Sequence, residues 1–173
     1  MEPTYNAPPI PDKNTLLLQK VNQILESLGS TSKYKRLSEK VEGCEALKGK
    51  KVMMIDDVLG LLEQIIPELM VATDGNAQAV LHRDQTLGGL VKAVLENNPD
   101  IILIDQDLNN NAKGSELLPL ILHHRPESFC VGFSSDKDNA RKFLAAGARG
   151  FVEKSSYDTE GCLQELAKLV EKK

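Results

Sequence analysis

Polar residues that could carry out chemistry follow four short apolar runs of this sequence. Asp56 and Asp57 come after VMMI, Asp105 after IILI, Ser134 after CVGF, and Lys154 after GFVE. In an open parallel sheet, ligands bind beyond the carboxyl ends of the strands, so these residues are expected to converge. Three carboxylates at one edge repel each other unless a cation neutralises them, and hard oxygen ligands suit Mg²⁺. The pattern therefore predicts a magnesium site.

With a metal at that edge, the same residue types suit the formation of an acyl phosphate. The carboxylate of Asp105 would attack phosphorus and form a covalent intermediate. The charge on the transferred oxygens would be met by Mg²⁺, the ammonium of Lys154 and the hydroxyl of Ser134. Hydrolysis of the intermediate would restore the free carboxylate. These residues predict a switch that phosphorylation sets and hydrolysis resets.

The elements that must position these residues alternate along the chain from Lys51 onward. Short apolar runs stand at 52–55, 79–82, 101–104, 130–133 and 150–152, and helical segments begin at Val58, Thr86, Ser115, Lys137 and Thr159. Strands that are apolar throughout are expected where helices cover both faces of a sheet. The sequence predicts an α/β fold with a five-stranded, doubly wound parallel sheet. Pro67 lies inside the first of these helices and is expected to kink or end it.

The residues ahead of this alternation have a different character. Residues 1–12 hold four prolines and no periodicity, which predicts a disordered N-terminus. Apolar residues then recur at three- and four-residue steps from Leu16 to Leu28, which is typical of an amphipathic helix. We expect an α-helical N-terminal extension over 13–48 and one domain over 50–173. The extension could pack onto its own domain or onto a second copy of the chain, so a homodimer stays an alternative.

Composition argues against several classes of function. The 173 residues carry a formal charge of -4, whereas a nucleic-acid surface needs clustered positive charge, so direct nucleic-acid binding is not expected. The three cysteines are widely spaced and form neither a CxxC nor a Cys/His metal pattern, which favours a reducing, cytoplasmic location. The sequence shows no signal peptide and no apolar run of about 18 residues, so no membrane segment is expected.

In combination and in this order, these residues resemble a response-regulator receiver domain of two-component signalling. The resemblance rests on the pair Asp56 and Asp57, the strand IILID ending in Asp105, Ser134, the segment AAGARGFVEK and Lys154, and it covers about seven tenths of the chain. It implies a flavodoxin-like, CheY-like fold and a phosphoprotein that accepts its phosphoryl group from a histidine kinase or phosphotransfer protein of a phosphorelay. Phosphorylation would then switch protein-protein interactions or dimerisation.

The resemblance assigns four residues to the metal and the phosphoryl group. Asp105 would be the phosphoacceptor and would also contact Mg²⁺. Asp57 would bind the metal directly, and Asp56 would bind it through water or as a second ligand. Asp107 would offer its backbone carbonyl.

Three further residues would respond to the phosphoryl group. Ser134 and Lys154 would hold its oxygens, and Phe151 matches the aromatic position whose ring turns inward on activation. An output domain C-terminal to the receiver is a feature of many relatives, so such a domain could be missing here. A helical extension ahead of a receiver is also similar to certain quorum-sensing regulators, although no motif carries that closer match.

Several residues depart from the receiver pattern. The loop DQDLNNNAKG has three asparagines where receivers usually carry a proline, and Ser155 follows Lys154 where receivers commonly have a cis proline. We expect a trans bond after Lys154, because a cis bond without proline costs about 2.5–4 kcal/mol. Ser135 stands where receivers usually have a smaller alanine or glycine, and Asp107 places a carboxylate where many relatives carry an uncharged residue. The departures keep open a second hypothesis, a pseudo-receiver scaffold that works without phosphorylation.

A third hypothesis is a small Mg²⁺-dependent phosphohydrolase. Asp105 and Asp107 form a D-x-D pattern similar to that of haloacid-dehalogenase-like enzymes, in which the second aspartate acts as general acid. Turnover of a phosphomonoester would identify that activity. The acidic pair after the first strand fits a receiver better, so we expect a phosphoacceptor that catalyses only its own phosphotransfer and dephosphorylation.

Overall fold

The computed structural model describes Glu39 and residues 41–172, so the predicted disordered N-terminus and most of the predicted helical extension lie outside the described residues. The elements in chain order are η1 (Glu45–Leu47), β1 (Val52–Asp56), α3 (Leu59–Ala72), β2 (Ala77–Leu81), α4 (Leu87–Asn97), β3 (Ile101–Asp105), α5 (Gly114–His124), β4 (Phe129–Ser134), α6 (Asn139–Ala145), β5 (Gly150–Glu153) and α7 (Thr159–Glu171). The predicted alternation of five strands with five helices is confirmed.

The five strands form one sheet in the order β2-β1-β3-β4-β5, and every neighbouring pair is parallel. This is the flavodoxin-like strand order, in which the direction of winding changes between β1 and β3. The predicted doubly wound parallel sheet is therefore confirmed. Ligands of such folds bind beyond the carboxyl ends of the two strands at the change, so β1 and β3 mark the place to look for a site.

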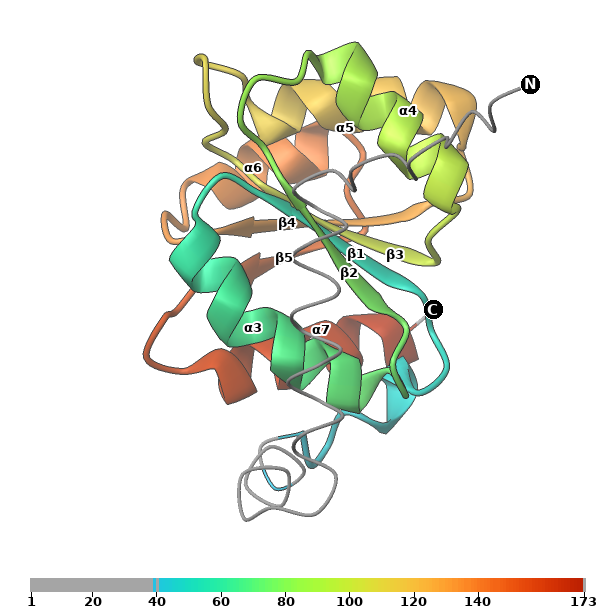
Figure 1. The fold of residues 1–173 in the computed structure, drawn as a ribbon, viewed down its shortest axis with the longest axis vertical. Coiled ribbons are helices and arrows are strands. Elements are labelled where there is room, and N and C mark those ends of the chain that lie inside the picture. The colour runs from blue at the N-terminus through green and yellow to red at the C-terminus, as the bar shows by residue number, and fades with distance from the viewer. Residues whose placement is uncertain (1–38, 40, 173) are drawn as a thin grey trace, which may run out of the picture.

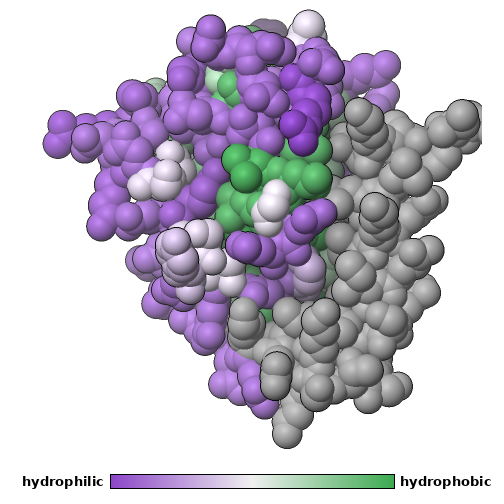
Figure 2. All heavy atoms as spheres, turned by 60° about the vertical axis from the view of Figure 1, so that its left-hand side comes forward, coloured by the Kyte–Doolittle hydropathy of each residue, from purple (hydrophilic) through white to green (hydrophobic). Residues whose placement is uncertain are grey.

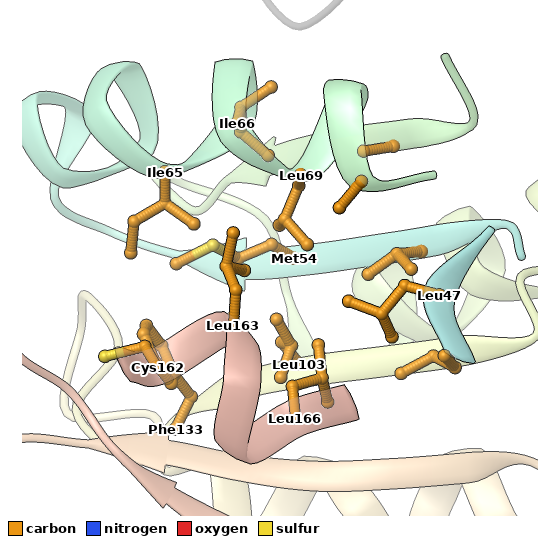
Figure 3. Close-up of a cluster of buried hydrophobic side chains, with 14 of the residues drawn as sticks. Leu47, Met54, Ile65, Ile66, Leu69, Leu103, Phe133, Cys162, Leu163 and Leu166 are labelled. Atoms are coloured by element: carbon orange, nitrogen blue, oxygen red, sulfur yellow. The ribbon is translucent and has the colours of Figure 1, made fainter. Parts of the chain in front are cut away.

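Helices cover both faces of the sheet. Figure 1 shows α3 and α7 on one face and α4, α5 and α6 on the other. Every residue of β1 and β3 is buried, because alternate side chains enter the two hydrophobic clusters on opposite faces. Met54 and Leu103, for example, point into the cluster under α3 and α7 (Figure 3), whereas Ile55 and Ile104 join the other cluster. The layers explain why these strands are apolar throughout.

Pro67 does not end the helix in which it lies. The α3 helix runs from Leu59 to Ala72 with Pro67 inside it. Proline removes one backbone hydrogen bond of a helix, but the residues around it are anchored in the core. Ile66 is 1% exposed and Leu69 is fully buried, so burial of this helix face outweighs the local cost of the proline.

The segment just before β1 packs into the core of the domain that follows it. Cys44 and Leu47 are 2% and 0% exposed and belong to the same hydrophobic cluster as residues of α3 and α7. Figure 3 shows Leu47 in this cluster. The side chain of Gln164 on α7 donates a hydrogen bond to the backbone oxygen of Glu42 at 3.2 Å. The last residues of the predicted extension thus contribute to the core of the following domain.

Among the residues coloured in Figure 2, most of the surface is hydrophilic, and one compact hydrophobic patch lies near the centre of the view. Of the helices that the structure describes, none combines the length and the apolar character that crossing a bilayer requires. Val58, directly ahead of α3, is 51% exposed, and Tyr157, between β5 and α7, is fully exposed. Both residues follow strand ends, close in sequence to the polar residues described next.

Candidate functional site

The carboxylates of Asp56, Asp57 and Asp105 meet at the carboxyl edge of the sheet. Asp56 is the last residue of β1 and Asp105 is the last residue of β3, and these strands are parallel neighbours. One oxygen of each carboxylate lies within 4.8 Å of the others. Asp56 is fully buried, Asp105 is 6% exposed and Asp57 is half-buried. The structure therefore brings together the three residues that the sequence proposed as metal ligands.

Lys154 lies between the two buried carboxylates. Its Nζ atom is 2.7 Å from Asp56 Oδ2 and 2.9 Å from Asp105 Oδ1, and its side chain is only 12% exposed. Its backbone N–H donates to the backbone oxygen of Ser134 at 2.9 Å, which ties the end of β5 to the end of β4. Among the described residues all peptide bonds are trans, including the one between Lys154 and Ser155, as expected.

Backbone donors fix one oxygen of each buried carboxylate. The N–H of Val58 donates to Asp56 Oδ1 at 2.8 Å, and the N–H of Gln106 donates to Asp105 Oδ1 at 2.8 Å. Asp105 Oδ1 therefore accepts from both Gln106 and Lys154. Asp105 Oδ2 receives no hydrogen bond or ion pair from the described residues. An ionised oxygen that has no partner is the one best able to attack an electrophile.

Burial makes Asp105 a weaker acid than an exposed aspartate. Its pKa is raised from 3.8 to about 6, chiefly because burial disfavours the charged form. The positive charge of Lys154 lowers the pKa in part, and the negative charge of Asp56 raises it again. At neutral pH the carboxylate is mostly ionised, but at a cost that a nearby cation would offset.

The charges of the cluster fit a divalent metal. Three ionised carboxylates and one ammonium group leave two negative charges uncompensated, which Mg²⁺ would neutralise. The ligands are hard carboxylate oxygens, the kind that Mg²⁺ prefers, and one of them, Asp57, stands at the more exposed side where metal-bound water could remain. The charge and the ligand type of these three carboxylates therefore fit a magnesium ion.

A hollow of about 390 Å³ opens above these groups. It is lined by Asp57, Val58, Leu61, Asp105, Asp107, Ser134, Ser135, Lys154 and Ser156. The hollow thus includes the hydroxyl residue Ser134 beside the phosphoacceptor candidate. Phe151 does not line it. This residue is half-buried over the other hydrophobic cluster, with its ring centroid 6.2 Å from that of Phe143.

The asparagines after β3 hold their loop in place. The side-chain amide of Asn109 donates to the backbone oxygen of His82 at 2.8 Å, and that of Asn110 donates to the backbone oxygen of Arg83 at 3.3 Å. Asn110 and Asn111 have φ values of 59° and 58°, a left-handed conformation that asparagine tolerates better than most residues. The sequence showed these residues only as a departure from a family pattern, since the hydrogen bonds span 27 positions.

Asp107 lines the hollow, but its carboxylate is engaged elsewhere. Its Oδ1 atom is 2.6 Å from Lys113 Nζ, and the two residues also form an antiparallel bridge across the base of the loop. The pKa of Lys113 is raised by the hydrogen bond to Asp107, so the ammonium form is favoured. The side chain of Asp107 therefore has a partner outside the carboxylate cluster.

Gly114, the first residue of α5, allows this helix to approach the end of β3. A Cβ atom at this position would collide with the backbone oxygen of Asp105 and lie 2.8 Å from the side chain of Ile104. We expect Gly114→Ala to lower the free energy of unfolding by about 2 kcal/mol, because such overpacking forces a backbone shift. Urea unfolding measures the change.

Gly60→Ala is the matched control. Gly60 lies in α3 and is exposed, and a Cβ atom added there would have no neighbour within 4 Å, so alanine should stabilise the protein by about 0.5–1 kcal/mol. Equal effects of the two substitutions would show that the contact between α5 and Asp105 is looser than the structure has it.

Comparisons with known proteins identify the fold. No family model matches the sequence, and no curated protein matches it. Among solved structures, the BeF3-activated receiver domain of DrrB is similar over 70% of this chain and 97% of its own, with 21% identity and a TM-score of 0.55. A LuxR-family response regulator from Aurantimonas is similar over 73% of this chain and 88% of its own, with 22% identity and a TM-score of 0.59.

A third similar structure is the receiver domain of NtrX from Brucella abortus. It is matched over 70% of this chain and 99% of its own, with 17% identity and a TM-score of 0.58. At such low identity the likeness concerns the fold. The described part of this chain has the fold of response-regulator receiver domains.

Proposed function

We propose that this chain is a phosphorylation-dependent switch that accepts a phosphoryl group on Asp105 in a Mg²⁺-dependent reaction. The observation that carries the proposal is the Oδ2 atom of Asp105, which has no partner among the described residues. Asp105 lines a hollow beside two more carboxylates, and its Oδ1 atom is held by Lys154 and by the N–H of Gln106. A nucleophile held in this way is ready for in-line attack on phosphorus.

The transfer forms one bond to phosphorus and breaks another. Asp105 Oδ2 attacks the phosphorus atom of a phosphohistidine or an acyl phosphate, and the donor leaves with the electron pair of its P–N or P–O bond. The product is a mixed anhydride of Asp105. Water then attacks phosphorus, the bond between phosphorus and Asp105 Oδ2 breaks, and inorganic phosphate leaves. Lys154 and the hydroxyl of Ser134 stabilise the negative charge on the transferred oxygens.

Four groups would hold the metal: the carboxylates of Asp56, Asp57 and Asp105, and the backbone carbonyl of Asp107. When bound, Mg²⁺ supplies positive charge against the phosphoryl oxygens. The partner would be a histidine kinase or a phosphotransfer protein of a cytoplasmic two-component pathway. Phe151 would turn toward the site once Ser134 has engaged the phosphoryl group. The response would be a changed protein-protein contact, either with an output domain or with a second copy of this chain.

Intact mass after incubation with acetyl phosphate tests the phosphorylation directly. We expect a gain of one phosphoryl group in the presence of Mg²⁺ and none in the presence of EDTA, because the cation offsets the repulsion between the donor and the carboxylates. The absence of any gain in folded protein, with a kinase or phosphotransfer protein also failing as donor, would favour the pseudo-receiver scaffold.

Mg²⁺ should also stabilise the protein in the absence of any phosphodonor. At a hundredfold excess over its dissociation constant, a ligand that binds only the folded state raises the free energy of unfolding by about 2.7 kcal/mol. Urea unfolding with and without Mg²⁺ measures this, and Asp57→Asn should remove most of the effect. Asp84→Asn, outside the carboxylate cluster, is the matched control that should keep it.

A phosphohydrolase is the less favoured function on this site. Such an enzyme needs a protonated general acid two residues after the nucleophile. Here the carboxyl group of Asp107 is paired with Lys113 at 2.6 Å on an exposed part of the loop, so it is already engaged by a cation. We therefore expect no turnover of phosphomonoesters by the protein.

A further inference from the structure

The hydroxyl of Ser134 is the end of a chain of hydrogen bonds that begins at the protein surface. Asn139, the first residue of α6, donates from Nδ2 to Ser134 Oγ at 3.0 Å. Its other side-chain atom, Oδ1, accepts from Lys142 Nζ at 2.7 Å. Asn139 and Ser134 are each 3% exposed, whereas Lys142 is exposed. Because Lys142 lies three positions after Asn139, both side chains share one face of α6.

These hydrogen bonds form a relay from Lys142 through Asn139 to Ser134. The donor and acceptor groups of the three side chains fix the direction of each bond. A lysine ammonium group can only donate, so the atom of Asn139 that faces Lys142 must be the oxygen. The amide nitrogen must then face Ser134, and a side-chain NH₂ can only donate. Ser134 Oγ is therefore an acceptor in this pair. A second, longer contact of 3.4 Å from the backbone N–H of Asp136 also ends on a lone pair of Oγ.

The hydroxyl consequently keeps its proton for another partner. A serine hydroxyl has two lone pairs and one proton, and both lone pairs are engaged by Asn139 and Asp136. Ser134 lines the hollow that also contains Asp105 and Lys154. An oxygen atom of a phosphoryl group on Asp105 is an acceptor, and a hydroxyl that is already oriented as a donor loses little entropy in binding it.

We propose that Asn139, oriented by Lys142, is a positioning residue that directs the Ser134 proton toward the transferred phosphoryl oxygens. The proposal rests on the phosphorylation of Asp105 and explains how the hydroxyl is prepared for it. No sequence motif pointed to these two residues, although Asn139 lies only five positions after Ser134.

Asn139→Asp reverses the direction of the relay at almost constant volume. Both oxygens of the new carboxylate can only accept, so the one facing Ser134 takes the hydroxyl proton away from the hollow. We expect the rate of labelling by acetyl phosphate with Mg²⁺ to fall about tenfold, less than the hundredfold or more that follows complete removal of an oxyanion donor. Lys142→Arg keeps a cationic donor and should label within about twofold of the wild type.

Two controls separate positioning from damage to the fold. Asn97→Asp, an isosteric change on α4 where the amide bonds the backbone oxygen of Ala93, should label at the wild-type rate. In a Ser134→Ala background there is no hydroxyl to direct, so adding Asn139→Asp should change the rate by less than about twofold. The affinity for Mg²⁺ should be the same in Asn139→Asp as in the wild type.

The outcomes distinguish this proposal from the function on which it rests. A wild-type protein that gains no phosphoryl mass from any donor overturns the proposed function and the relay with it. A wild type that is labelled, together with an Asn139→Asp variant that is labelled equally fast, overturns the relay alone. If Asn139→Asp slows labelling as much in the Ser134→Ala background as in the wild type, the relay is also overturned. The new aspartate would then act through its charge or by unfolding the protein, and not through the hydroxyl of Ser134.

Discussion

Asp105→Asn is expected to abolish covalent phosphorylation. The amide nitrogen or oxygen of asparagine is too weak a nucleophile to displace the phosphodonor. None of the other described carboxylates combines an unpartnered oxygen with an ion pair to Lys154 in the hollow that Ser134 lines. Intact mass after incubation with acetyl phosphate and Mg²⁺ should show no gain, whereas the wild type gains one phosphoryl group. Retention of full labelling in the variant would exclude Asp105 as the acceptor.

The same substitution should stabilise the metal-free protein at neutral pH. The pKa of Asp105 is raised from 3.8 to about 6, first by burial, so the folded state holds this proton more tightly than the unfolded state does. The free energy of unfolding then falls as the pH rises from about 4 to about 6, because the buried carboxyl ionises. Above pH 6 this destabilisation is complete. The difference between the two pKa values corresponds to about 3 kcal/mol at most.

Asparagine does not ionise and escapes this cost. In EDTA we expect Asp105→Asn to unfold with a free energy about 1–3 kcal/mol above that of the wild type at pH 7.5, and with an equal free energy at pH 4. Urea unfolding at the two pH values measures this. Asp100→Asn, an exposed aspartate at the opposite end of β3, is the control that should show no such gain. A wild type that is the more stable protein at pH 7.5 would contradict the raised pKa.

Much of the fold was predictable because its signals are local. Each buried strand is a short apolar run, and each helix follows it with a helical pattern, so periodicity alone gave the alternation and the parallel sheet. The convergence of Asp56 and Asp105 followed from the sheet as well, since parallel strands end at one edge. One outcome expected from local sequence did not occur, since Pro67 does not end its helix. The helix continues because one of its faces is buried in the core.

Several other contacts of the site join residues far apart in the chain. The amide of Asn109 reaches the backbone of His82, and no pattern within a short window predicts such a bond. The relay through Asn139 is local by contrast, with bonds that span five and three positions, but the sequence does not show how the turn after β4 aims these side chains. Lys154 was found at a strand end, but its two ion pairs, one of them across 98 positions, depend on the folded arrangement of three strands.

Lys154→Met is expected to destabilise the metal-free protein by about 3–5 kcal/mol at neutral pH. Methionine keeps most of the volume of the side chain but leaves the carboxylates of Asp56 and Asp105 buried, ionised and without their shared ammonium partner. The loss should shrink as the pH falls toward about 6, because without the positive charge of Lys154 the pKa of Asp105 lies above about 6 and the variant takes up this proton at a higher pH than the wild type does. Mg²⁺ should restore part of the stability. Urea unfolding with EDTA and with Mg²⁺ measures each difference.

Lys137→Met provides the matched control. Lys137 pairs with Glu153 at 3.1 Å, but the side chains are 76% and 45% exposed, so solvent screens the pair and its loss should cost less than about 1 kcal/mol at any pH. The difference between the stability losses of Lys154→Met and Lys137→Met shows whether the ammonium group of Lys154 neutralises the two buried carboxylates. If Lys154→Met proves as mild as Lys137→Met, the two buried carboxylates are neutralised by protons rather than by the ammonium group, and the cluster would no longer carry the two negative charges that a magnesium ion requires.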